Sequence, residues 1–167
     1  VFESGSETIA GSSITYTNTS GDNWTAAYTV NSSDTDGDVT FTINFSDTAG
    51  NAGTPVTVVT DSSAVEVDMS ASISSVSADW GDYLNAVEDN SDGTITITTA
   101  DIEDGQTVTV NIKQGSTIVH TDTDTVSSNA ASITVLAADL QNTSTFVEDS
   151  TYTIFVSVSD IAGNSVT

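Results

Sequence analysis

The stretch Val39-Thr-Phe-Thr-Ile-Asn-Phe-Ser-Asp-Thr-Ala-Gly-Asn51 decides the fold, because it returns as Tyr152-Thr-Ile-Phe-Val-Ser-Val-Ser-Asp-Ile-Ala-Gly-Asn164. In both copies apolar and polar residues alternate, which is typical of a β-strand with one buried face. The strand then ends in Ser-Asp-x-Ala-Gly-Asn, whose Gly-Asn pair suits a tight hairpin. A strand and turn that recur in this way indicate two homologous units.

The same alternation appears along most of the chain. It recurs in short segments rich in Thr, Val and Ile, which are separated by Gly and Asp turn tracts. These segments are residues 24–30, 95–97, 108–112 and 133–135. The exception is Val135–Gln141, where one or two helical turns are expected between strands. The pattern predicts an all-β protein built of antiparallel sandwiches.

The repeat also predicts the domain boundaries. A linker is expected between Asp61 and Ala71, which gives a first unit of residues 1–68 and a second of residues 69–167. Aligned on the repeat, Lys113–Ser116 falls near Phe2–Gly5, so the first unit is expected to lack its opening strands. The last strand of the second unit is expected to be cut short. The chain is therefore interpreted as a window on a longer array.

Charge excludes several kinds of partner. The 167 residues hold 18 Asp and 6 Glu against a single Lys and no Arg, and the formal net charge is −23. Binding nucleic acid or an anionic membrane requires cationic side chains to neutralise phosphates, so neither is expected as a partner. The sequence contains no cysteine and therefore no disulfide or thiolate zinc site. Metal cations are the ligands that such a field attracts.

The segments in their order resemble a known family. The Trp24–Tyr28 strand, the Thr35–Phe41 turn and strand, the two Ser-Asp-x-Ala-Gly-Asn signatures and the Asp82–Glu88 segment resemble bacterial immunoglobulin-like tandem repeats. Such repeats occur in large secreted RTX-type adhesins and related surface proteins. The resemblance implies seven-stranded sandwiches on the bacterial cell surface, partnered by adjacent repeats of the same polypeptide. It also implies a rod-like extender role, with calcium stiffening the domain junctions.

An acidic loop supplies the first candidate calcium site. Calcium prefers six to eight oxygen ligands from carboxylates, amides, backbone carbonyls and water. Such groups cluster at the start of the second unit, so an interdomain site is predicted there. Its ligands would be Asp68, Asp79, Asp82, Asn85 and Glu88. Carboxylates packed this closely repel unless a cation is present. The alternative is a solvated acidic loop that keeps the protein soluble.

Two further acidic segments are candidate sources of calcium ligands. Glu103 and Asp104 are expected beside Asp160, because loops at one end of a sandwich gather together. Against this, Asp47 and Asp160 each precede an Ala-Gly-Asn turn, where Asp commonly accepts hydrogen bonds from its own turn backbone. The Asp34–Asp38 segment spaces its carboxylates like the start of a calcium loop but lacks the closing Glu. A turn between strands explains that segment equally well.

The remaining chemistry favours a protein that is not an enzyme. His120 is the sole histidine, so no zinc site of the usual composition can form, and no Gly-x-Ser-x-Gly elbow is present. Trp24 is expected in a core or on a sheet surface. Trp80, in the acidic loop, is the better candidate for exposure, although packing across a domain interface is favoured.

Three functions follow from these expectations. The first is a structural extender of a bacterial adhesin or surface fibre. The second is a carbohydrate- or protein-binding module, for which the long Leu136–Glu148 connection is the one departure from the repeat. The third is a fibre subunit that is completed by strands from a neighbouring subunit. Repetition favours the extender, because every added copy lengthens the protein.

Overall fold

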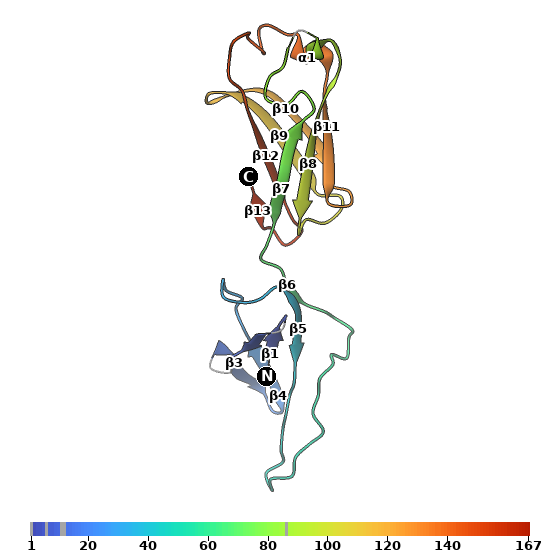
Figure 1. Cartoon of the computed structure of the whole chain (residues 1–167). Coiled ribbons are helices and arrows are strands. Elements are labelled where there is room, and N and C mark those ends of the chain that lie inside the picture. Colours follow the sequence, from blue (N-terminus) through green and yellow to red (C-terminus); the bar gives the residue numbers. More distant parts are fainter. Residues whose placement is uncertain (1, 6, 11–12, 86) are drawn as a thin grey trace. The chain divides into compact units, whose positions relative to one another are not determined.

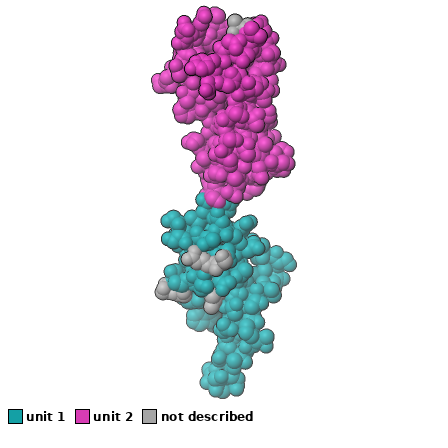
Figure 2. Space-filling model, in the orientation of Figure 1, with its two compact units in different colours: residues 1–69 teal, residues 70–167 magenta. Residues whose placement is uncertain are grey.

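The chain is almost entirely β-structure, as the alternation predicted. A computed structural model describes residues 2–5, 7–10, 13–85 and 87–167. The chain divides into two compact units, residues 1–69 and 70–167 (Figures 1 and 2). This division falls one residue from the expected boundary. The all-β fold class is confirmed.

Unit 2, residues 70–167, is a sandwich of two antiparallel sheets. Seven strands form it: β7 (Ser72–Ala78), β8 (Gly93–Ala100), β9 (Thr107–Gln114), β10 (Thr117–Thr125), β11 (Ala130–Val135), β12 (Thr153–Ser159) and β13 (Ser165–Val166). One sheet has the order β11-β8-β7, and the other has the order β10-β9-β12-β13 (Figure 1).

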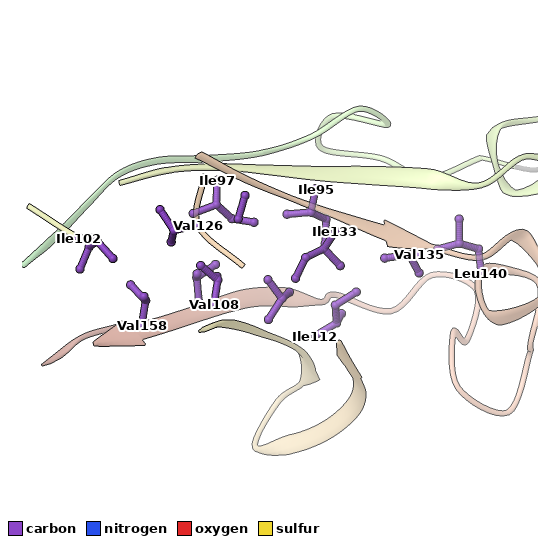
Figure 3. Packing of buried hydrophobic residues seen from close by; sticks show 13 residues of the cluster. Ile95, Ile97, Ile102, Val108, Ile112, Val126, Ile133, Val135, Leu140 and Val158 are labelled. Atoms are coloured by element: carbon purple, nitrogen blue, oxygen red, sulfur yellow. The ribbon is translucent and has the colours of Figure 1, made fainter. Parts of the chain in front are cut away.

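The core of unit 2 lies between these two sheets. Alternate residues of β8 and β9 point inward, which is the period-two pattern of a half-buried strand. In Figure 3, Ile95, Ile97 and Ile133 line one side of the core, and Val108, Ile112 and Val158 line the other. Burying each such side chain contributes about 1.5–3 kcal/mol relative to leaving it exposed. The buried cluster is Ile95, Ile97, Ile102, Val108, Val110, Ile112, Val126, Ala131, Ile133, Val135, Leu140, Val156 and Val158.

The connection from β11 to β12 closes one end of the sandwich. It contains the short helix α1 (Ala137–Leu140), within the segment where helical turns were expected. Leu140 is buried in the core. Further along, the Tyr152 hydroxyl accepts a hydrogen bond from the Val147 backbone N–H at 2.5 Å and donates to the Thr145 carbonyl at 3.2 Å. The Tyr152 and Phe146 rings pack 5.1 Å apart. The long connection is therefore a packed part of unit 2.

An acidic side chain covers the edge where the two sheets of unit 2 approach each other. Register pairing places Asp122 opposite Val110 and Asp124 opposite Val108, so both share the inward face of β10. Asp124 Oδ2 accepts a hydrogen bond at 2.9 Å from the Ser132 backbone N–H on the edge strand β11. Inward-pointing charges of this kind protect sheet edges from pairing with other chains.

Unit 1, residues 1–69, has one four-stranded sheet and a separate hairpin. The sheet has the order β2-β1-β5-β6, and β3 pairs with β4 alone (Figure 1). Its strands are β1 (Phe2–Ser4), β2 (Glu7–Ile9), β3 (Thr15–Ser20), β4 (Asn23–Ala27), β5 (Gly37–Phe41) and β6 (Glu66–Val67).

The four-stranded sheets of the two units have the same strand order, and β1 pairs with β5 in the register in which β9 pairs with β12. Strand β6 pairs with the start of β5, whereas β13 pairs with the end of β12. Thr40 pairs with Glu3 in unit 1, as Thr153 pairs with Lys113 in unit 2. The preceding hairpins turn at equivalent glycines, Gly5 with φ 55° and Gly115 with φ 58°. After the repeated turn, Ser46 faces Ala52 as Ser159 faces Ser165. This agrees with the alignment of Lys113 to the segment around Glu3 that the repeat predicted.

The core of unit 1 is far thinner than that of unit 2. Among its described residues, the buried apolar side chains are Ile9, Ile14 and Val67. Large apolar side chains on β3, β4 and the segment after β5 are exposed instead: Tyr16, Trp24, Ile43 and Phe45. An exposed apolar surface of this kind is unusual in a stable monomer.

Candidate functional site

The acidic loop after Ala78 lies at the end of unit 2 opposite its amino end. Strand β7 runs from Ser72 to Ala78, about 20 Å of extended chain, before the loop begins (Figure 1). The expectation that this loop lies at the amino end of the unit, facing the first, is therefore wrong. Asp79, Asp82, Asn85 and Glu88 stand at the far end of β7 from Ser70.

Within that loop, Asn85 and Glu88 hold each other. Glu88 Oε2 accepts hydrogen bonds from the Asn85 backbone N–H at 3.1 Å and from Asn85 Nδ2 at 2.6 Å. In return, Asn85 Oδ1 accepts from the backbone N–H of Val87 at 2.9 Å. This reciprocal arrangement closes the turn that leads into the 3₁₀ helix Glu88–Asn90 and resembles a capping box. Asp79 and Asp82 are exposed beside it.

Glu103 and Asp104 link three loops by hydrogen bonds at the end of unit 2 that carries Ser70. Ser72 pairs with Ala100, so the loop after β8 belongs to the end where unit 2 begins. Glu103 Oε2 accepts a hydrogen bond from the Ile161 backbone N–H at 3.0 Å. Asp104 Oδ1 accepts from the Ser128 backbone N–H at 2.7 Å. The structure therefore places Glu103 beside the Asp160 turn and Asp104 beside Ser128. Each carboxylate has a second oxygen that takes no part in these bonds.

Asp160 is committed to its own turn. The buried Asp160 accepts hydrogen bonds through Oδ1 from the backbone N–H groups of Gly163 and Asn164, and through Oδ2 from Asn164 Nδ2, all within 2.7 Å. Burial raises the pKa of Asp160, but these hydrogen bonds outweigh it and hold the pKa below its ordinary value. The carboxylate thus acts as a structural acceptor for the turn.

The first copy of the turn is built in the same way. Asp47 Oδ1 accepts from the backbone N–H groups of Ala49 and Asn51, and Oδ2 accepts from Asn51 Nδ2 at 2.8 Å. The hydrogen bonds from Asn51 lower the pKa of Asp47. Hence the Ser-Asp-x-Ala-Gly-Asn signature is explained by backbone chemistry, which was the alternative to a metal site.

Carboxylates also gather at the carboxy end of unit 1. Asp36 Oδ1 accepts a hydrogen bond from the Met69 backbone N–H at 2.9 Å, one residue beyond the half-buried Asp68. Asp38 and Glu66 are direct cross-strand partners on β5 and β6. Like charges directly opposite each other destabilise a strand pair. A cation at this end would relieve that repulsion.

Asp34, the first residue of the candidate calcium loop, serves a local network. Its Oδ1 accepts from the Tyr28 hydroxyl at 2.6 Å and its Oδ2 from the Asn31 backbone N–H at 2.8 Å. These contacts support the interpretation of Asp34–Asp38 as a turn. A hollow of about 180 Å³ lined by Ser4, Ile9, Tyr28, Asn31 and Asp34 adjoins it, which is below the range of ordinary small-molecule sites.

Among the described residues, the contacts of His120 and Lys113 bear on metal binding and catalysis. Across the described residues, no three His, Asp or Glu side chains are grouped so that they could hold a metal ion. His120 Nε2 is buried without a hydrogen-bond partner, so no serine hydroxyl donates to it. Lys113 Nζ lies 3.8 Å from the centre of the Phe155 ring.

Trp24 and Trp80 differ in exposure, and the sequence predicted the position of Trp24 but not that of Trp80. Trp24 is exposed on β4, which fits a sheet-surface position. Trp80 instead packs on the core of its own unit, where a Cβ on Gly93 would lie 2.3 Å from the Trp80 ring. The six-membered ring of Trp80 therefore lies against the backbone of Gly93, where a side chain would clash with it. The sequence-based preference for Trp80 as an exposed or interface residue missed this contact.

Comparisons with known proteins give one structural likeness. No protein-family model and no curated protein matches the chain. A solved structure described as a Ca²⁺-stabilized adhesin that helps an Antarctic bacterium reach out and bind ice is similar over 99% of this chain. The sequence identity is 23%, the TM-score is 0.39, and the chain spans 36% of that protein's chain. The described residues contain no helix long and apolar enough to cross a membrane.

Proposed function

We propose that the chain is an extender segment of a bacterial surface adhesin or fibre, built from tandem immunoglobulin-like sandwiches. The observation that carries this proposal is the strand order shared by the four-stranded sheets of the two units, together with the register shared by the β1–β5 and β9–β12 pairs. A repeated domain whose ends are joined by the short segment 68–71 adds length with each copy. The chain would then lie outside the cell, and any binding of a target would belong to other parts of the parent protein.

Calcium is proposed as the ion that stiffens the junction between the two units. Of the candidates, Glu103 and Asp104 at the amino end of unit 2 are the ligands we favour, because each carboxylate has a second oxygen beyond the one that accepts a backbone hydrogen bond. Asp160 supports the loop that Glu103 contacts. The chain has one Lys against 24 acidic residues, and Lys113 lies over the Phe155 ring, so nearly all of the negative charge lacks an internal counter-charge. External cations are the remaining source of counter-charge.

The other acidic loop has a separate place in this proposal. Asp79, Asp82, Asn85 and Glu88 lie at the end of unit 2 toward which β13 runs. They would serve a junction at that end, and not the one between the two units described. A ligand-binding module is less well supported. Its best candidate, the Leu136–Glu148 connection, is fixed by Leu140 and Tyr152.

Calcium removal tests the proposal in solution. Small-angle X-ray scattering and differential scanning calorimetry of the full chain would be recorded with calcium and with chelator. With calcium the particle is expected to be extended and uniform, and with chelator the distribution of maximum dimensions should broaden. A ligand at a hundredfold excess over its Kd stabilises the folded state by about 2.7 kcal/mol. Profiles and melting temperatures that chelator leaves unchanged would reject calcium stiffening.

Two double variants assign the site. Glu103→Gln with Asp104→Asn keeps one acceptor oxygen for Ile161 and Ser128 but removes two charges, and it should imitate chelation in the scattering profile. Asp82→Ala with Glu88→Ala is the matched control, because it removes the same charge from the other end of unit 2. If only the control pair abolishes the calcium effect, the proposed ligand set is wrong.

A further inference from the structure

In the described part of unit 2, the outer faces of the two sheets carry no carboxylate. Strands β7 to β13 hold acidic side chains only at Asp122 and Asp124, which share the inward face of β10. The other acidic residues of this unit lie in the connections between strands. Thr and Ser take most outward positions, as in the cross-strand pair Thr109–Ser157. The preference of strands for Thr over Asp explains part of this pattern. Its result is two nearly uncharged faces on a chain of net charge −23.

One of these faces is hollowed into a groove. The groove has a volume of about 450 Å³ and lies on strands β9, β12 and β13, which run side by side in Figure 1. Because Val108, Val156 and Val158 are buried, the residues that alternate with them point outward. The volume lies within the usual range of small-molecule sites, about 300–1,000 Å³. Most of the lining side chains carry a hydroxyl or an amide group, among them Thr107, Thr109, Ser157, Ser159, Ser165 and Gln106.

The polar groups of this groove are largely available to a ligand. Thr109 and Ser157 face each other across β9 and β12, and both are half-buried. The hydroxyl groups of Ser159 and Ser165 lie 2.7 Å apart and hydrogen-bond to each other. In the part of the chain that the structure describes, no protein group hydrogen-bonds to the hydroxyl of Thr109 or Ser157 or to the side-chain amide of Gln106. Each of these groups can both donate and accept a hydrogen bond.

We propose that this groove binds a neutral oligosaccharide. The hydroxyl groups of a sugar donate and accept hydrogen bonds, so they match side chains that do the same. A sugar can therefore displace water from half-buried hydroxyls and replace its hydrogen bonds. An apolar ligand would leave the same hydroxyls unpaired, which costs free energy.

The charge of the groove argues against other classes of ligand. None of its described lining residues is acidic, so the groove lacks the carboxylate ligands that calcium prefers. None is basic either, and the net charge of −23 repels anionic sugars. A neutral saccharide needs no counter-charge from the protein.

A sugar bound here is a contact on the side of unit 2. The inference goes beyond the proposed extender role, in which the target is bound by other parts of the parent protein. It is also independent of calcium, because neither of the favoured calcium ligands, Glu103 and Asp104, lines the groove. The groove is likewise distinct from the Leu136–Glu148 connection, none of whose described residues lines it.

An NMR titration of the full chain, carried out with chelator present, tests this inference. The probes are the neutral trisaccharides maltotriose, cellotriose and triacetylchitotriose, and the anionic trigalacturonate. We expect at least one neutral trisaccharide to shift the backbone amide signals of residues 106–109 and 157–159. Binding should require millimolar concentrations, because an open groove buries less of a ligand than an enclosed site does. Trigalacturonate should leave these signals unshifted. The absence of shifts with all three neutral sugars would overturn the proposal, and so would equal binding of trigalacturonate.

Side-chain variants locate the bound sugar. Thr109→Ala with Ser157→Ala removes two hydrogen-bonding groups and should weaken binding at least about fivefold. Thr96→Ala with Ser132→Ala is the matched control, because it removes another Thr–Ser cross-strand pair, exposed on the other sheet. This control should bind the sugar as the unmodified chain does. Ser157→Tyr introduces a residue that suits a strand but fills the groove, so it should abolish binding.

Melting temperatures establish that each variant is folded. Unchanged binding by Ser157→Tyr would put the sugar elsewhere and overturn the proposal, as would equal weakening by the two Ala pairs. Because calcium is absent throughout, sugar binding and calcium stiffening can fail separately.

Discussion

The hydroxyl of Tyr152 reaches back five residues to accept a hydrogen bond from the Val147 backbone N–H at 2.5 Å. It also donates to the Thr145 carbonyl at 3.2 Å. Tyr152 precedes β12, and the bonded backbone belongs to the connection that crosses from one sheet to the other. A tyrosine at this corner is a hallmark of Greek-key sandwiches. Its hydroxyl satisfies backbone groups that no strand partner can reach.

Tyr152→Phe is expected to lower the free energy of unfolding of unit 2 by about 0.5–1.5 kcal/mol, because the exposed Val147 N–H loses its acceptor and the part-buried Thr145 carbonyl loses its donor. Chemical denaturation followed by circular dichroism measures the change. Tyr83→Phe is the matched control, since Tyr83 is exposed and lacks such a hydrogen bond. Equal stability of the two variants would mean that the corner does not stabilise the sandwich.

Thr99→Val is expected to stabilise unit 2. The Thr99 hydroxyl is buried without a hydrogen-bond partner, and replacing it by a methyl group of similar shape removes a desolvated polar atom worth about 1 kcal/mol or more. The Thr99 backbone N–H keeps its bond to the Asn129 carbonyl. Thr98→Val, on the exposed face of the same strand, is the control and should gain much less. A melting temperature lowered by Thr99→Val would contradict the prediction.

Acid should destabilise unit 2 partly through Asp160. Because its pKa is lowered in the folded state, Asp160 stabilises the fold at a pH above its unfolded pKa of about 4. This stabilisation is lost as the pH falls through the lower folded value. Asp160→Asn should reduce stability at neutral pH and flatten the acid limb of a plot of unfolding free energy against pH. Asp149→Asn, at an exposed loop position, should leave that limb unchanged.

The two units should differ in stability within one chain. Unit 2 has a thirteen-residue buried apolar cluster, whereas few apolar side chains are buried in the described part of unit 1. Amides of β5 are therefore expected to exchange with solvent faster than those of the equivalent strand β12, and heating should unfold unit 1 first. Hydrogen exchange followed by mass spectrometry compares the two strands directly. A single cooperative transition with equal protection would contradict this expectation.

Strong alternation made most of the fold predictable. Residues 95–97, 108–112 and 133–135 lie on strands of unit 2 because Ile and Val alternate with Thr on faces buried on one side only. The first-unit strand expected over residues 39–45 was predicted too long. Regular pairing ends at Phe41, and beyond it only isolated bridges at Ile43 and Ser46 continue.

Strand β7 was not identified from the sequence. The acidic loop that follows it was therefore expected at the wrong end of unit 2. Its Ser-rich sequence holds Ile73 and Val76, and a bulge between Ile73 and Ser75 breaks the period-two pattern. Without this strand, the acidic loop at Asp79 was expected beside the linker, whereas seven residues of β7 intervene. The Tyr152 corner was also missed, because its hydrogen bonds depend on a crossover that alternation does not report.

The hydrogen bond of the Asp124 side chain bears on how unit 2 folds during synthesis. Tandem copies of one domain emerge from the ribosome at high local concentration, where a strand of one copy can pair with the edge of the next and trap both in a misfolded state. Asp124 occupies the N–H group of Ser132 that an intruding strand would use, and its charge repels the identical edge of a neighbour. A single inward-facing carboxylate thereby favours folding of unit 2 on its own strands during synthesis.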